Sequence, residues 1–255
     1  MTPHRPCAVI PVYNHGATVR GVVAHLRACG LPCILVDDGC AGPSAEVLDA
    51  LAAEGSVLLR RGRNGGKGRA VQDGLRHAAA LGYTHALQID ADGQHAVEDV
   101  PAFLAAARAH PAALIAGAPQ YGDDAPRSRL YGRWLTRVWV WINTLSRDIP
   151  DAMCGLRLYP LVPTLAVLKN GDPGQRMDFD IAILVRLHWA GVPMRWLPTA
   201  VRYPPGGISH FRGWRDNWLI SRMHARHFAG MLRRAPGLLM RHCRRHASVA
   251  EAGDS

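Results

Sequence analysis

Two aspartates one residue apart carry the clearest chemical signal in the chain. Asp90 and Asp92 lie in the sequence IDADGQH, directly after a short apolar run that predicts a strand. Residues two apart on an extended backbone point the same way, so both carboxylates can face one divalent cation. A Mg²⁺ or Mn²⁺ ion held in this way keeps positions open for phosphate oxygens. The pair therefore predicts a diphosphate site, and its structural alternative is an acidic turn.

A glycine-rich loop at residues 61–68, with the sequence RGRNGGKG, is the second cluster. Its backbone N–H groups can wrap an anion, and the helix expected after it would direct its N-terminus and Lys67 at that anion. A Walker A loop needs glycine where Arg61 stands and serine or threonine where Gly68 stands. The loop therefore disfavours a P-loop kinase or ATPase, and its structural alternative is a plain turn.

Asp37 and Asp38 form a third cluster at the end of another predicted strand. A carboxylate there can accept hydrogen bonds from ribose hydroxyls or from a base N–H. Taken alone, the two aspartates could equally cap the next turn.

These clusters need a scaffold, and the chain supplies alternating apolar runs and helical patterns that predict βαβ units with a mostly parallel sheet. Strands are expected at residues 7–12, 33–36, 56–60, 86–89 and 113–116. Helices are expected at residues 17–29, 44–54 with Ser44 as N-cap, 69–81, 97–110, 131–145 and 181–190. Ligands gather beyond the carboxyl ends of strands in open α/β sheets, so we expect the three clusters to meet at one edge.

The composition is that of a folded globular protein. The chain has 255 residues, of which 48% are hydrophobic and 20% charged, and this excludes disorder as the main state. No apolar run reaches the roughly 18 residues that span a bilayer, and no secretory leader precedes the first strand, so we expect a cytoplasmic protein. The six cysteines match neither a zinc pattern nor a disulfide framework and are expected to be free thiols.

Together these segments resemble the family 2 glycosyltransferases with the GT-A fold, most of all the dolichyl- or polyprenyl-phosphate mannosyl- and glucosyltransferases. The resemblance rests on IPVYN at 10–14, VDDG at 36–39, NGGKG at 64–68, DADGQH at 90–95, and Asp151 with GLR at 155–157. Their order and spacing agree with the family over roughly residues 7–200. The resemblance implies a Rossmann-like, mostly parallel sheet flanked by helices, and an enzyme that transfers a hexose with inversion.

The resemblance also implies roles for individual residues. The donor nucleotide-sugar would be bound by Pro11, Asn14, Asp37, Asp38, Asn64, Lys67, Asp90, Arg157, Arg202, His210 and Arg212. Mg²⁺ or Mn²⁺ would be bound by Asp92 and Gln94, with Asp90 in support. Arg202, His210 and Arg212 fall in a segment that in the family closes over the donor. The chain departs from the family at His210, where a lysine or arginine is usual.

A general base is expected on the acceptor side, because an acceptor hydroxyl must lose a proton as it attacks the anomeric carbon. Asp178 and Asp180, in the sequence RMDFDI, are the candidates. The resemblance favours Asp180 as the base and Asp178 as its neighbour. In the alternative interpretation, either aspartate only caps the following helix and complements its dipole.

The basic character of the chain, +10 overall, is concentrated near its end: residues 202–255 hold ten arginines and three acidic residues. Between residues 214 and 245 these arginines alternate with tryptophan, leucine and methionine, a pattern that suits a helix on an anionic membrane surface, with an interruption expected at residues 236–237. The alternative is an ordinary helix packed on the domain. A nucleic-acid partner is disfavoured, because no helix-turn-helix, RNP or zinc pattern accompanies the charge.

The expected organisation is a GT-A domain at residues 1–212, a basic amphipathic helical region at 213–246 and a disordered tail at 247–255. The expected function is metal-dependent transfer of a hexose from a UDP- or GDP-linked donor to a lipid or lipid-linked acceptor, by an enzyme bound peripherally to the inner face of the cell membrane. Two alternatives remain: transfer to a small soluble or polyketide-like acceptor, and an inactive module that binds a nucleotide-sugar. A nucleotidyltransferase is disfavoured, because its glycine-rich signature would follow the first strand.

Overall fold

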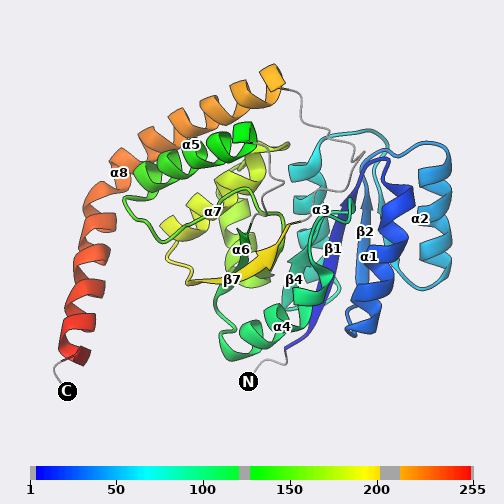
Figure 1. Cartoon of the computed structure of the whole chain (residues 1–255), viewed down its shortest axis with the longest axis horizontal. Helices are drawn as coiled ribbons and strands as arrows, with labels where there is room; N and C mark the ends of the chain where they lie inside the picture. The colour runs from blue at the N-terminus through cyan, green and yellow to red at the C-terminus, as the bar shows by residue number, and fades with distance from the viewer. Residues whose placement is uncertain (1–3, 121–126, 202–212, 254–255) are drawn as a thin grey trace.

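A mixed sheet forms the centre of the molecule (Figure 1). The computed structural model describes residues 4–120, 127–201 and 213–253, and within them seven strands follow the order β3-β2-β1-β4-β6-β5-β7. The strands are β1 (Pro6–Val12), β2 (Cys33–Asp37), β3 (Val57–Arg60), β4 (His85–Gln88), β5 (Leu114–Gln120), β6 (Arg157–Pro160) and β7 (Met194–Ala200). All neighbours pair in parallel except β6, which is antiparallel to β4 and β5. The predicted parallel α/β sheet is confirmed.

Helices cover both faces of the sheet. They are α1 (Gly16–Ala28), α2 (Pro43–Ala53), α3 (Lys67–Ala80), the 3₁₀ turn η1 (Val97–Asp99), α4 (Val100–Ala109), α5 (Arg127–Thr144), α6 (Leu161–Lys169), α7 (Asp178–Trp189) and α8 (Gly213–Gly253). One core lies between the sheet and helices α1, α2 and α4, and a second lies under α3, α6 and α7. The burial of these apolar faces is the main stabilising contribution to the fold.

The strand register brings distant polar segments to one edge of the sheet. Val12 at the end of β1 pairs with Asp37, and Gln88 at the end of β4 pairs with Val9. Because β6 runs antiparallel, its first residue, Arg157, lies opposite Gln88. The segment before β6 therefore reaches the same edge as the segments that follow β1, β2 and β4.

The prediction of Ser44 as an N-cap is wrong. Helix α2 begins one residue earlier, at Pro43, whose fixed φ suits a first helical position, and Gly42 is its N-cap. The Ser44 hydroxyl instead accepts a hydrogen bond from the backbone N–H of Gly16, at 3.2 Å. Its side chain links two helices rather than capping one.

Helix α8 is longer than the sequence indicated. It continues through Pro236, where an interruption was expected, and it includes residues 247–253, which were expected to be disordered. Figure 1 shows its axis turning along its length, as a proline inside a helix permits, and the alanines after residue 246 favour continued helix. The first part of α8 packs on α5 and α7 through Met223, Met231 and other buried side chains. Among the described helices, none is long and apolar enough to cross a membrane.

Candidate active site

A cavity of about 1390 Å³ opens at the edge where the polar segments meet. Eight of the site residues expected from the sequence line it: Pro11, Asp38, Asn64, Lys67, Asp90, Asp92, Gln94 and Asp180. Four others are not among its lining residues: Asn14, Asp37, Arg157 and Asp178. The last three, Arg202, His210 and Arg212, lie outside the described residues.

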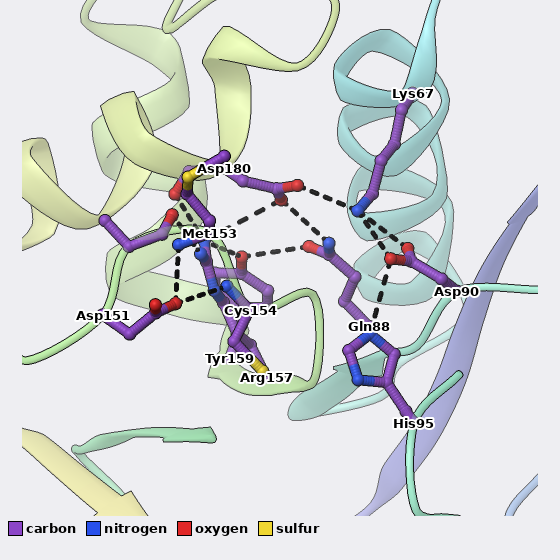
Figure 2. Close-up of polar contacts among 11 residues, drawn as sticks. Lys67, Gln88, Asp90, His95, Asp151, Met153, Cys154, Arg157, Tyr159 and Asp180 are labelled. Atoms are coloured by element: carbon purple, nitrogen blue, oxygen red, sulfur yellow. Dashed lines mark hydrogen bonds and ion pairs between the residues drawn. The ribbon is translucent and has the colours of Figure 1, made fainter. Parts of the chain in front are cut away.

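Lys67 connects the two halves of the site. Its Nζ lies 2.8 Å from the carboxylate of Asp90 and 2.9 Å from Oδ2 of Asp180 (Figure 2). Helix α3 begins at Lys67, two residues earlier than predicted, so the lysine belongs to its first turn. Burial alone would lower the pKa of Lys67, but the two carboxylates raise it above its ordinary value. Lys67 is therefore a fixed cation between two anions.

Asp90 has a second partner on its other side. His95 Nε2 lies 3.4 Å from Oδ2 of Asp90. Burial alone would raise the pKa of Asp90, but Lys67 and His95 lower it below its ordinary value. Burial alone would lower the pKa of His95, but Asp90 and the neighbouring Cys154 raise it to about 10. A protonated histidine, an ionised aspartate and a protonated lysine thus form a charged row along the cavity.

Asp180 is held by several buried groups. Gln88 Nε2 donates to its Oδ1 at 2.9 Å, and Tyr159 donates in turn to Gln88 at 3.0 Å. Arg157 donates to the backbone carbonyl of Asp180 at 2.6 Å and to that of Ala152 at 2.9 Å. Arg157 is 1% exposed, so it positions other groups in this structure. These hydrogen bonds orient Asp180 from the buried side of the site, while the residue also lines the cavity.

The segment before β6 is shaped by Asp151. Its Oδ1 accepts hydrogen bonds from the backbone N–H groups of Met153 and Cys154, at 2.8 and 2.7 Å. Its Oδ2 accepts from Arg133 of α5 at 2.8 Å. This turn brings Gly155 against Asp90, where a Cβ would lie only 2.5 Å from Oδ2 of the aspartate. Only glycine leaves room for the Asp90 carboxylate here.

The glycine-rich loop binds a carboxylate of the protein itself. The backbone N–H groups of Gly65 and Gly66 both donate to Asp38, at 2.9 Å each, and Arg61 pairs with the same carboxylate. Two N–H groups that were expected to hold a phosphate are therefore occupied. Asp38 lines the cavity at this loop, whereas Asp37 binds the N–H of Cys40 and the guanidinium of Arg60.

A divalent cation fits the remaining donor set. Asp92 lines the cavity, and one of its oxygens accepts from the backbone N–H of Gln94 at 3.0 Å. No group of three metal-binding side chains occurs among the described residues. A hard cation held by one carboxylate would complete its coordination with water and substrate phosphates, as Mg²⁺ commonly does. Asp92 is the carboxylate best placed for this role, because Asp90 is already paired.

Comparison with known proteins places this site in a family. The model of the family described as Glycosyl transferase family 2 matches residues 7–169, which include the loop with Lys67, both aspartates of the DAD sequence and the segment around Gly155. The chain is a family 2 glycosyltransferase. The resemblance inferred from the sequence is confirmed, and with it the prediction of an enzyme.

Two curated relatives of this glycosyltransferase carry functional names. An undecaprenyl-phosphate mannosyltransferase of Micrococcus luteus is 29% identical over 191 residues, which cover 71% of this chain and 77% of the relative. A polyprenol monophosphomannose synthase of Mycolicibacterium smegmatis is 30% identical over 173 residues, 61% of either chain. Both names specify a lipid-phosphate product or acceptor.

Solved structures agree on the fold. Glucosyl-3-phosphoglycerate synthase from Mycobacterium tuberculosis has a TM-score of 0.63 at 15% identity, over 89% of this chain and 80% of that one. A mannosyltransferase from Pyrobaculum calidifontis, in complex with GDP-Man and Mn²⁺, has a TM-score of 0.56 at 16% identity, over 90% of this chain and 64% of that one. The expected GT-A fold of this glycosyltransferase is confirmed.

The glycosyltransferase separates its two candidate bases. Asp180 lines the cavity, whereas Asp178 lines a different one, between α7 and α8. Burial raises the pKa of Asp178, whose Oδ1 accepts from the backbone N–H of Arg176 at 3.1 Å. Of the two candidate bases, Asp180 alone lines the main cavity.

Sequence reasoning missed several residues of the site. Gln88 and Tyr159 are buried on adjacent strands, where nothing distinguishes them from other strand residues until Asp180 is placed above them. His95 was part of the motif, and its position five residues after Asp90 was a signal that it could be a partner. Leu135 and Trp139 of α5 and Ile220 of α8 also line the cavity, and their periodic apolar pattern suggested only helix.

Proposed function

We propose that the chain transfers a hexose from a nucleoside diphosphate sugar to the phosphate of a polyprenyl-type lipid, with inversion at the anomeric carbon. In this step an acceptor oxygen bonds to the anomeric carbon while the bond from that carbon to the donor phosphate breaks and the nucleoside diphosphate leaves. The names of the two curated relatives support a lipid-phosphate acceptor and mannose as the sugar.

One observation supports a lipid acceptor more than any other. The cavity extends from the charged row of Lys67, Asp90 and His95 to a space between α5 and α8. Its lining there includes Leu135 and Trp139, which are 44% and 38% exposed, so the cavity reaches the apolar surface of the molecule. A volume of about 1390 Å³ also exceeds the roughly 300–1,000 Å³ of an ordinary small-ligand site. A donor at the charged end and a lipid at the apolar end would fill it.

A divalent cation would be held by Asp92, with Gln94 beside it and the donor diphosphate as the other source of oxygens. Such a cation neutralises the charge that builds on the nucleoside diphosphate as it leaves. The bound Mn²⁺ in the Pyrobaculum calidifontis structure supports this part of the proposal. His95, which lies on the other side of Asp90 from Lys67, keeps the Asp90 carboxylate paired with the protein's own charges. Asp90 therefore supports the sugar rather than the divalent cation.

The role of Asp180 depends on the acceptor. A phosphate monoester has a second pKa near 6, so its oxygen attacks as an anion and needs no general base. An acceptor hydroxyl would need Asp180 to take its proton. The pairing of Asp180 with Lys67 at 2.9 Å and with Gln88 at 2.9 Å suits the first case, in which Asp180 orients Lys67 toward the two substrates.

A membrane surface would deliver such an acceptor. Helices α5 and α8 lie side by side along one edge of the molecule (Figure 1), and each exposes an apolar stripe at helical spacing. On α8 the stripe consists of Trp214, Trp218, Leu232 and Leu239, with Arg215, Arg222, Arg226 and Arg233 beside it. On α5 it consists of Tyr131, Trp134, Leu135 and Ile142. We place these stripes on the anionic inner face of the cell membrane.

Calorimetric titration with UDP and GDP, each with and without Mn²⁺, tests the donor site. We expect metal-dependent binding of one nucleotide and its loss in Asp92→Asn, which should remain folded. Near wild-type transfer by Asp92→Asn would overturn the role of the cation. Donor binding without transfer or hydrolysis would favour an inactive binding module.

Transfer to a short-chain polyprenyl phosphate, compared with the matching polyprenol and with soluble acceptors, tests the acceptor. We expect the phosphate alone to be used. Preference for a soluble acceptor would overturn the lipid proposal and leave the family unaffected. Asp180→Asn should reduce the rate at least tenfold because it loses the ion pair with Lys67, whereas Asp178→Asn is the matched control and should retain the rate.

Sedimentation with vesicles tests the membrane surface. We expect Leu232→Ala with Leu239→Ala to weaken binding to anionic vesicles. The control pair is Leu81→Ala with Val162→Ala, which removes two exposed aliphatic side chains elsewhere on the molecule and should bind as the wild type does. Equal binding by both pairs would refute the membrane surface without affecting the catalytic proposal.

A further inference from the structure

A second cavity, of about 430 Å³, lies between α7 and α8, and we call it the arginine groove. Four guanidinium groups line it, from Arg186 on α7 and from Arg222, Arg226 and Arg234 on α8. The three groups on α8 are spaced by four and eight residues, so they lie along one side of the helix. The groove shares no lining residue with the main cavity.

In the parts of the chain that the structure describes, none of the four arginines forms an ion pair with a carboxylate. Arg186 donates to the backbone carbonyls of Gly171 and Asp172, at 2.7 and 3.0 Å. Arg234 donates to the carbonyl of Gly230 at 2.9 Å and lies over the ring of Trp189. These contacts hold the guanidinium groups of Arg186 and Arg234 in place but do not neutralise them.

Two carboxylates also line the groove, and both are engaged by their own loop. Asp172 accepts from the backbone N–H of Gly174 at 2.8 Å and from the side chain of Gln175 at 3.0 Å. Asp178 accepts from the backbone N–H of Arg176. Four positive charges therefore face two carboxylates whose oxygens already accept hydrogen bonds, and the groove keeps a positive excess.

The electrostatics of the buried groups agree with this excess. Burial lowers the pKa of Arg186, and Arg234 and Arg226 lower it further, against the opposite effect of Asp172. Burial together with Arg186 lowers the pKa of His227 to about 3, so this histidine is neutral. A bound anion reduces the repulsion between like charges that are held close together in one groove.

We propose that the arginine groove binds a phosphate group, carried by a soluble phosphate compound or by a lipid headgroup. Guanidinium groups donate paired hydrogen bonds to phosphate oxygens, and a tetrahedral phosphate can accept them from several directions at once. A carboxylate offers only two oxygens in one plane and would leave part of the set unused. Arg222 and Arg226 lie on the side of the groove that adjoins the exposed stripe of α8. Their guanidinium groups could therefore bind either a lipid headgroup at the membrane surface or a soluble phosphate.

The proposal does not rest on the proposed transfer reaction, and its test uses the whole chain. The groove variant is Arg222→Gln with Arg226→Gln. The matched control is Arg215→Gln with Arg233→Gln, which removes the same charge from exposed positions of the same helix that do not line the groove. Inorganic pyrophosphate is titrated calorimetrically in metal-free buffer, and each variant is also sedimented with phosphatidylcholine vesicles that contain phosphatidylglycerol.

We expect the groove variant to bind at least tenfold more weakly than the control, because two charge-assisted contacts are lost. Loss of pyrophosphate binding identifies a soluble phosphate as the ligand. Loss confined to the vesicles identifies a lipid headgroup. Equal behaviour of the groove variant and the control in both titrations overturns the proposal, whatever the transfer assay shows.

Discussion

Gly155→Ala should lower the activity of the enzyme at least about tenfold without unfolding it. The new Cβ would lie 2.5 Å from Oδ2 of Asp90 and 3.1 Å from Nε2 of His95, whereas ordinary contact begins at 3.4 Å. The carboxylate must therefore move by about 0.9 Å. Asp90 cannot turn aside freely, because Lys67 holds it at 2.8 Å.

The expected loss follows from that contact. A hydrogen bond between charged groups is worth about 1.5–3 kcal/mol, and each 1.36 kcal/mol of transition-state stabilisation is a factor of ten, so kcat/KM should fall roughly 10- to 150-fold. The assay is hexose transfer to the proposed polyprenyl phosphate acceptor, together with the melting temperature. The backbone φ at Gly155 is not positive, so backbone strain does not add to the effect.

Gly132→Ala is the matched control. Gly132 lies in α5 and also lines the main cavity, but a Cβ there meets nothing within 4 Å. Its rate should remain that of the wild type, and alanine should stabilise the helix by about 0.5–1 kcal/mol. A Gly155→Ala enzyme with a wild-type rate would refute the argument that Asp90 must stay where Lys67 and His95 hold it.

Three further outcomes are expected. Gly74→Ala should lower the free energy of unfolding by about 1–3 kcal/mol, because its Cβ would lie 2.4 Å from a methyl group of Val9, whereas Gly21→Ala, with open space, should not; equal denaturant midpoints would contradict this. His95 has a pKa of about 10 in the folded state and 6.5 ordinarily, so the stability that it contributes is complete below pH 6.5 and is lost as the pH rises toward 10. The difference in unfolding free energy between wild type and His95→Gln should therefore shrink over that range. A constant difference would refute the pairing with Asp90. Iodoacetamide at pH 8 should label exposed Cys243 in the native protein but should label Cys7 only after unfolding, because burial raises the pKa of the Cys7 thiol to about 12; mass spectrometry of the peptides decides.

The sequence predicted the parts of the fold that depend on local pattern. Alternating apolar runs and helices predicted the parallel strands, and the position of Asp90 and Asp92 after a strand predicted the edge at which the site lies. Antiparallel β6 was not predicted. It has four residues, as do β3 and β4, but it lies outside the regular alternation of strands and helices that revealed those two strands. Its direction is what buries Arg157 under Asp180.

The pairing inside the site could not be predicted from local spacing. Lys67 pairs with Asp180 across more than a hundred residues of chain, and Asp38 takes the loop N–H groups that were expected to hold a phosphate. Both contacts depend on how separate elements pack, and a glycine-rich loop has the same local sequence whether its anion comes from a ligand or from the protein. In α8 the local signal was misleading instead, because Pro236 predicted an interruption and the helix continues through it.

The link from Lys67 to Asp180 also bears on how the chain folds. Gln88 ends β4 and Asp90 follows that strand, whereas Asp180 belongs to α7, so Lys67 and Gln88 meet Asp180 only when segments far apart in the sequence have come together. Contacts of such long separation form late, because the closing of a long loop costs entropy before any contact compensates for it. A nascent chain that stops before α7 contains Asp90 as a partner for Lys67 but lacks Asp180, the second partner. Recovery of transfer activity during refolding should therefore lag behind recovery of helical signal, and activity becomes a measure of complete folding.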